Sequence, residues 1–139
     1  MKNKIYSFCA IAFLACMFLF STPSKCEAQT FIAKLEYMTP LGGDPTSMIP
    51  VTDGSTLTVV VVNGWGQTKA QGFIRFASGD ETRTSLLTVN QYNNTTLNAT
   101  NGEYLPYAFE SIIIWFEKKV MSICVANTSY TGTITSIIN

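Results

Sequence analysis

The chain has 139 residues, nine basic and nine acidic side chains, and no histidine. The absence of histidine excludes Ser-His-Asp triads and histidine-rich zinc sites, because imidazole is the usual proton carrier and commonest metal ligand near neutral pH. No cluster of basic residues is present, so we expect neither a nucleic-acid partner nor a polybasic contact with anionic lipid.

The first 28 residues have the order of a secretory signal peptide. Lys2 and Lys4 precede an apolar stretch over 5–20, which is short for a membrane span, and a small residue, Ala28, follows further on. We predict cleavage between Ala28 and Gln29. The protein is therefore expected to be exported, either secreted to the extracellular space or placed in the periplasm or on the cell surface.

Two alternatives remain open for this segment: a lipoprotein attached through the lipobox-like residues 13–16, and an uncleaved anchor. Cleavage would leave Cys124 as the lone cysteine, because Cys9, Cys16 and Cys26 lie before residue 28. Cys124 lies in the apolar run 120–126, so we predict a buried, inert thiol, with an intermolecular disulfide as the alternative.

The remaining residues, 29–139, are expected to form one all-β domain. Short runs of β-branched and aromatic residues alternate with Gly, Asn, Asp, Pro and Ser, and neither heptads nor repeats occur. The predicted strands are 31–38, 55–62, 72–77, 84–92, 110–117, 120–126 and 130–138. These indicate a single antiparallel β-sandwich of about seven to eight strands.

The connections between these strands follow from turn-forming residues. Asn63-Gly64 predicts a tight hairpin, helped by Gly66, and the polar segments 39–54 and 93–101 are expected to be loops. Lys118-Lys119 is expected to turn the chain, although a bent strand or a short helix would also fit, since no glycine is present there.

No pattern of catalytic or metal-binding residues is apparent, so we expect no enzyme activity, no catalytic residues, no metal and no cofactor. Glu110 and Glu117 are expected on opposite strand faces, and Asp80-Glu81 in an exposed turn, whereas a glycosidase needs two facing carboxyl groups. The region of Asp44 and Asp53 lacks the spacing of a calcium loop.

Uncharged polar and aromatic residues gather in one segment and suit a neutral ligand. Amide and hydroxyl groups bind sugar hydroxyls in both directions, and an aromatic face covers the C–H side of a sugar ring. The alternative is a loop that Asn and Thr merely keep soluble. The predicted ligand-binding residues are Asn90, Gln91, Tyr92, Asn93, Asn94, Thr95 and Trp65, with Tyr104 as a further aromatic.

The same region resembles the fungal fruit-body lectins, which are related to the actinoporins. The resemblance covers about residues 72–97 and the C-terminus: 72–78 is similar to the family's Gly-x-Leu-Arg-Phe-x-Ser strand, 89–92 to its Val-His-Asn-Tyr segment, and 137–139 to its Ile-Ile-Gly ending. It implies a β-sandwich that recognises cell-surface glycans, with Gln91 at the sugar-contacting asparagine and Tyr92 beside the pocket. The family's histidine is replaced by Asn90, so no particular sugar follows.

We therefore expect a secreted, non-catalytic, lectin-like module whose partners are glycans or glycoconjugates. One alternative is a self-assembling surface or adhesin subunit, in which the C-terminal strand pairs with another copy as a homo-oligomer. Another is an actinoporin-like membrane-active protein, which would contact membranes through surface glycans or lipids. Four sequons, at Asn93, Asn94, Asn98 and Asn127, leave glycosylation open.

Overall fold

The computed structural model describes residues 27–41, 47–101 and 109–139, in which every regular element is a β-strand. Residues 1–26 of the predicted signal peptide, and Tyr104, lie outside the described residues, whereas its last two residues, Glu27 and Ala28, are in β1. The strands are β1 (Glu27–Pro40), β2 (Ile49–Pro50), β3 (Thr56–Gly64), β4 (Gln67–Arg75), β5 (Glu81–Arg83), β6 (Leu87–Tyr92), β7 (Thr96–Thr100), β8 (Ser111–Trp115), β9 (Val120–Val125) and β10 (Thr128–Ile138).

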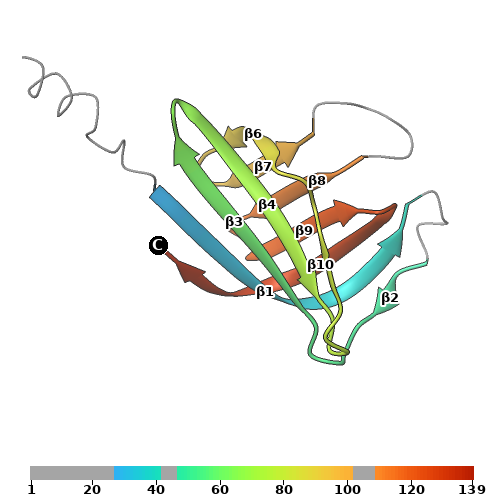
Figure 1. The fold of residues 1–139 in the computed structure, drawn as a ribbon. Coiled ribbons are helices and arrows are strands. Elements are labelled where there is room, and N and C mark those ends of the chain that lie inside the picture. Colours follow the sequence, from blue (N-terminus) through green and yellow to red (C-terminus); the bar gives the residue numbers. More distant parts are fainter. Residues whose placement is uncertain (1–26, 42–46, 102–108) are drawn as a thin grey trace, which may run out of the picture.

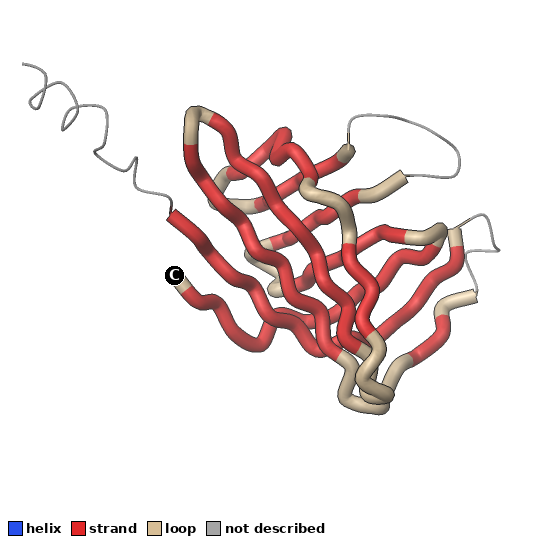
Figure 2. Tube along the Cα trace, in the orientation of Figure 1, coloured by secondary structure: helices blue, strands red, loops and turns tan. Residues whose placement is uncertain are grey.

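The strands form one antiparallel sheet that closes into a barrel. Its order is β10-β9-β8-β7-β6-β4-β3-β1, and β1 also pairs with β10, which joins the two edges (Figure 1). β2 adds to β1 and β5 adds to β4 outside this circuit. The expected all-β class is confirmed, but the expected sandwich is wrong, because eight strands enclose a single interior (Figure 2).

Gly132 makes the closure of the barrel possible. A Cβ atom at this position would lie 2.0 Å from the carbonyl oxygen of Lys34, so only glycine allows β10 to approach β1 this closely. The pairing joins residues about a hundred positions apart, from Thr30 with Ile138 to Pro40 with Thr128. Local patterning produces similar strands in a sandwich and in a barrel, so this pairing decides between them.

Side chains at alternate strand positions fill the interior. Phe31, Ala33 and Leu35 on β1 are buried, and so are the matching apolar residues on the other barrel strands. β4 and β9 lie on opposite walls, yet a Cβ atom added at Gly72 would come within 3.0 Å of the Ile123 side chain. The interior is therefore a packed core, as expected for a small barrel.

The predicted strand positions are confirmed in part. The predicted strand 72–77 belongs to β4, which begins at Gln67, and the predicted loop 39–54 contains the end of β1 and β2. The segment 93–101 is not wholly a loop, since it contains β7, whose Leu97 and Ala99 are fully buried. The predicted strand 84–92 is shorter and begins at Leu87. The β3–β4 hairpin turns at Trp65 and Gly66 instead of at Asn63-Gly64, and both turn residues have positive φ.

The predicted turn at Lys118-Lys119 is confirmed. It lies between β8 and β9, and Lys119 adopts φ 54° where a glycine would be usual. This turn meets the β6–β7 turn, where the Phe116 N–H donates to the Thr95 carbonyl (2.9 Å). The β3–β4 turn lies at the same end of the barrel, where β1 begins and β10 ends, because Glu27 pairs with Asn63 and Thr30 with Ile138.

The opposite end is held by a buried serine in the segment before β3. The Ser55 hydroxyl donates to Asp53 (2.6 Å) and accepts from the Ala77 N–H (3.1 Å), which links this segment to the β4–β5 turn. The hydrogen bonds from the Ser55 hydroxyl and N–H lower the pKa of the Asp53 carboxyl.

Candidate functional site

A pocket of about 470 Å³ opens at the end of the barrel where β1 begins. We call it the mouth, and its lining residues are Glu27, Ala28, Gln29, Val61, Tyr92 and Asn139. They come from β1, β3, β6 and the residue that follows β10. The mouths of β-barrels are among the places where ligand pockets occur most often.

Strand alternation directs the side chains of Gln29, Val61 and Tyr92 toward the barrel axis. Gln29 is two residues before the buried Phe31, and it pairs across β3 with Val61, which is itself buried. Tyr92 pairs with Leu97, whose side chain is in the core. The mouth is thus the last layer of the interior, where inward positions become polar.

Hydrogen bonds connect three uncharged side chains across the mouth. The Tyr92 hydroxyl donates to Gln29 Oε1, and Gln29 Nε2 donates to Asn139 Oδ1 at 2.5 Å. An amide has two N–H donors and two acceptor lone pairs, so each of these groups keeps capacity for a ligand. Residues from the first and last described strands therefore share one polar network.

Aromatic rings support Tyr92 from below. Its ring lies 6.1 Å from Phe116, and Phe116 lies 5.7 Å from the buried Phe31. The two ring pairs are tilted, with interplanar angles of 34° and 43°, and they connect the mouth to the core. Burial raises the pKa of the Tyr92 hydroxyl, so the group is a neutral donor and acceptor at neutral pH.

The predicted ligand-binding residues all lie toward this end of the barrel, but they face in different directions. Only Tyr92 lines the mouth, while Trp65 is at the tip of the neighbouring β3–β4 hairpin and is 95% exposed. A β-bulge between Val89 and Gln91 leaves both Asn90 and Gln91 on the outer side of β6. The Asn90 amide there donates to the Thr100 hydroxyl at 2.9 Å.

The polar turn after β6 is shaped by its own side chains. Asn93 Oδ1 accepts bonds from the backbone N–H groups of Thr95 (2.9 Å) and Thr96 (2.8 Å), and from the Thr95 hydroxyl (2.8 Å). This is an Asx-type turn, which accounts for Asn93 and Thr95 structurally. Asn94, at the exposed tip, is the member of this turn for which no such bond is described.

Gln29 and Asn139 were not predicted as site residues. One is at the expected start of the mature chain and the other ends the sequence, and they meet because β1 pairs with β10. The lectin resemblance includes the closing Ile-Ile-Asn segment, but it assigns no ligand contact to Asn139. Its position beside β1 could have been found only from the barrel topology.

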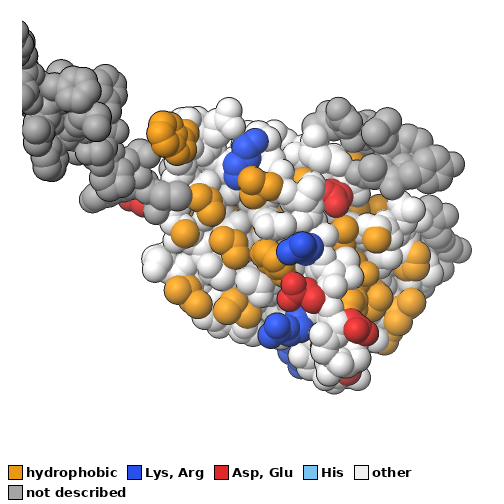
Figure 3. All heavy atoms as spheres, in the orientation of Figure 1, with side chains coloured by type: hydrophobic (Ala, Val, Ile, Leu, Met, Phe, Trp, Pro, Cys, Tyr) orange, Lys and Arg blue, Asp and Glu red, His pale blue; other side chains and the backbone are white. Residues whose placement is uncertain are grey.

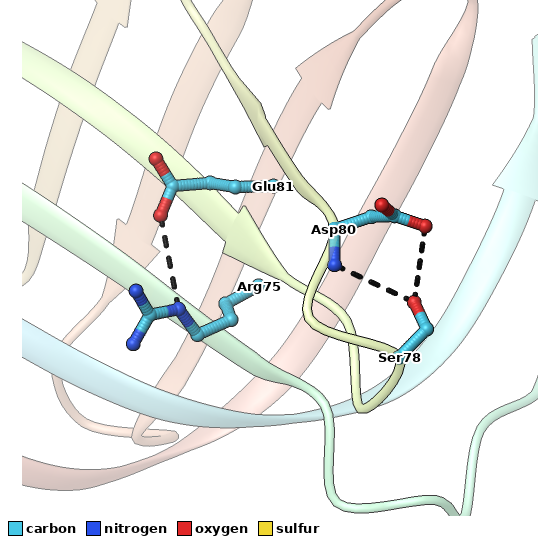
Figure 4. A network of polar contacts seen from close by, with 4 residues as sticks. All are labelled: Arg75, Ser78, Asp80 and Glu81. Carbon is cyan, nitrogen blue, oxygen red and sulfur yellow. Dashed lines mark hydrogen bonds and ion pairs between the residues drawn. The ribbon is translucent and has the colours of Figure 1, made fainter.

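The acidic residues considered for catalysis lie apart. In the β4–β5 turn, Asp80 accepts from the Ser78 hydroxyl (3.1 Å), while Glu81 lies 3.9 Å from Arg75, so their carboxylates do not face one another (Figure 4). Glu110 instead accepts from the Ser85 N–H at 3.0 Å. Among the described residues, no three His, Cys, Asp or Glu side chains are placed to hold a metal ion.

Cys124 is buried, as predicted, and its side chain lies on the outer side of β9. Its thiol lies 3.9 Å from the Phe109 carbonyl, and burial, together with the Glu110 charge, raises its pKa. A raised pKa disfavours the nucleophilic thiolate.

None of the described segments is a helix with the length and hydropathy needed to span a bilayer. Comparison with known proteins finds no family model, no curated protein and no solved structure that this chain matches.

Proposed function

We propose that this protein is a non-catalytic, lectin-like module that binds a neutral, polyhydroxylated ligand, a cell-surface glycan, in the mouth of its barrel. The observation that carries the proposal is the uncharged network of Tyr92, Gln29 and Asn139 in an open pocket above a packed core. The exported location proposed from the N-terminal segment would bring the mouth to such ligands.

The chemistry of the mouth suits sugars better than ions. Each sugar hydroxyl both donates and accepts, and amide and phenol groups can meet it in either direction. Glu27 carries the one charged side chain among those that line the pocket. Predicted cleavage after Ala28 would remove Glu27 and Ala28 and would place the α-amino group of Gln29 at the mouth. Figure 3 shows the barrel wall at β3 and β4, where Lys, Arg, Asp and Glu side chains lie among hydrophobic and uncharged polar ones.

The proposal is tested by removing a single hydroxyl group. We expect Tyr92→Phe to lower affinity on a glycan array and in calorimetry by about tenfold, since a polar group of the ligand loses its partner. Tyr37→Phe is the matched control, because Tyr37 is a partly exposed tyrosine on β1 near the opposite end. The absence of any glycan ligand for the wild-type protein would refute the proposal.

The same array separates the mouth from the outer face of β6. The lectin resemblance implies that Gln91 contacts the sugar, whereas in the barrel Gln91 faces away from the mouth. We expect Gln91→Ala to bind as the wild type does. Loss of binding in Gln91→Ala with normal binding in Tyr92→Phe would move the site to the outer face.

Self-assembly is a second candidate, and one observation favours it. β10 pairs with β9 only as far as Thr133, so its last residues have β1 on one side and an open edge on the other. Ile137 and Ile138 on this segment are about half exposed. Pairing of two such edges would appear as a dimer in size-exclusion chromatography, and a stable monomer would eliminate it.

A further inference from the structure

The β3–β4 turn places Trp65 in a backbone conformation that tryptophan seldom adopts. The two-residue turn between β3 and β4 has φ 56° at Trp65 and 73° at Gly66. Such primed turns favour Asn-Gly, and a bulky residue with positive φ is an outlier. An Asn63-Gly64 pair, which would suit this turn, lies two positions earlier in the same hairpin.

The Trp65 side chain contributes no packing to offset this conformation. It is 95% exposed, whereas the other tryptophan, Trp115, is half-buried on β8. The backbone strain at Trp65 is not offset by burial of its indole ring, so this residue destabilises the hairpin. Residues with strained backbone conformations concentrate at ligand contacts. Core packing therefore does not account for a tryptophan at this position. The turn does not need an aromatic ring either, since the two-residue β9–β10 turn has Ala126 at φ 50°.

The position of Trp65 relates it to the mouth. Val61 lines the pocket and lies four residues earlier on β3, which corresponds to about 13 Å along an extended strand. In Figure 1 the β3–β4 hairpin projects past the start of β1, so its tip stands above the mouth end of the barrel. A single sugar ring is too short to contact both places.

We propose that the ligand is an extended, neutral oligosaccharide, with one sugar unit in the mouth and a later unit stacked on the exposed face of Trp65. This inference rests on the proposed function of the mouth. The indole ring would cover the apolar C–H face of a pyranose, a contact that needs no charge and adds affinity with chain length. Trp65 is then the residue that makes the site prefer a chain over a monosaccharide.

The experiment compares ligand lengths in two variants. Glucose, mannose and N-acetylglucosamine, and the linear oligomers of each, are titrated by calorimetry into the wild type, Trp65→Ala and Trp65→Phe. We expect Trp65→Ala to weaken oligomer binding by about tenfold and to leave monosaccharide binding unchanged. Trp65→Phe should restore part of the loss, because a smaller aromatic face remains.

Fluorescence provides an independent measurement. In Trp115→Phe, Trp65 is the sole tryptophan of the chain. Oligomers should quench or shift its emission, whereas monosaccharides should bind without changing it.

The outcomes separate this inference from the proposed function. If Tyr92→Phe weakens binding but Trp65→Ala binds oligomers as the wild type does, the mouth is the site and the extended ligand is refuted. Equal losses for monosaccharides and oligomers in Trp65→Ala would also refute it, since Trp65 would then act on the mouth itself. If the wild type binds none of these sugars or any glycan on the array, both proposals fail.

Discussion

Replacing Trp65 by asparagine should stabilise the protein while it weakens binding of a long ligand. The wild-type turn holds an L-residue with a large side chain at φ 56°. Asparagine is among the few residues that adopt this region readily, because its short side chain bonds to the local backbone. Asn-Gly would then occupy the turn in the order that such hairpins favour.

The magnitude follows from two terms. A left-handed conformation costs an ordinary L-residue about 1–2 kcal/mol, and asparagine avoids roughly half of this. The second term, lost burial, is close to zero because the Trp65 side chain is 95% exposed. We therefore expect a gain of about 0.5–1 kcal/mol, equivalent to roughly 2–8 °C in the thermal midpoint of a domain of this size.

Urea denaturation, followed by far-ultraviolet circular dichroism, measures this change as a higher midpoint with an unchanged slope. Trp65→Ala is the control, since alanine has a Cβ atom and remains strained, so its stability should stay within about 0.5 kcal/mol of the wild type. A lower midpoint for Trp65→Asn would show that the indole packs in solution, and the reasoning about strain would be wrong. An equal gain in Trp65→Ala would assign the effect to the exposed apolar surface instead.

Three further changes test the barrel and its mouth. Gly132→Ala should reduce the free energy of unfolding by more than about 3 kcal/mol, because the new Cβ atom would overlap the Lys34 carbonyl oxygen, and a wild-type melting curve would contradict this. Gly72→Ala should cost about 1–3 kcal/mol by overpacking, and adding Ile123→Val should recover part of it. Burial raises the pKa of Tyr92, so the stabilisation from its neutral form is complete below pH 10.0 and is lost as the pH rises above that value. Tyr92→Phe should lack this alkaline loss in denaturation curves, and an identical pH dependence would contradict the assignment.

Much of the strand pattern can be predicted from the sequence, because alternation is a local property. Phe31, Ala33 and Leu35 alternate with more polar residues, and they form the buried face of β1 as expected. β7 was missed because its threonines and asparagine suggested a loop, although Leu97 and Ala99 between them carry the same period of two. The alternation of Leu97 and Ala99 with polar residues would have predicted β7 if the composition of the segment had been given less importance.

The closure of the sheet could not be predicted in the same way. Pairing of Phe31 with Ile137 joins positions more than a hundred residues apart, and nothing in either segment alone selects its partner. The candidate site could not be fully predicted for the same reason, because its residues come from both ends of the sheet. Tyr92 and Trp65 can be proposed from their chemistry, whereas Gln29 and Asn139 enter the proposed site only when the two ends of the sheet meet.

A packed interior also determines how such a site can discriminate among ligands. Large barrels can enclose a ligand, but here the walls at Gly72 and Ile123 are in contact, so a ligand is confined to the mouth and its rim. The Phe31–Phe116–Tyr92 series holds the floor of the mouth rigid, which reduces the entropy lost on binding. We therefore expect discrimination among ligands to depend on residues of the turns that border the mouth. Substitutions at the exposed rim, such as Trp65, should therefore change affinity with little loss of stability, whereas substitutions in the aromatic floor should change both together.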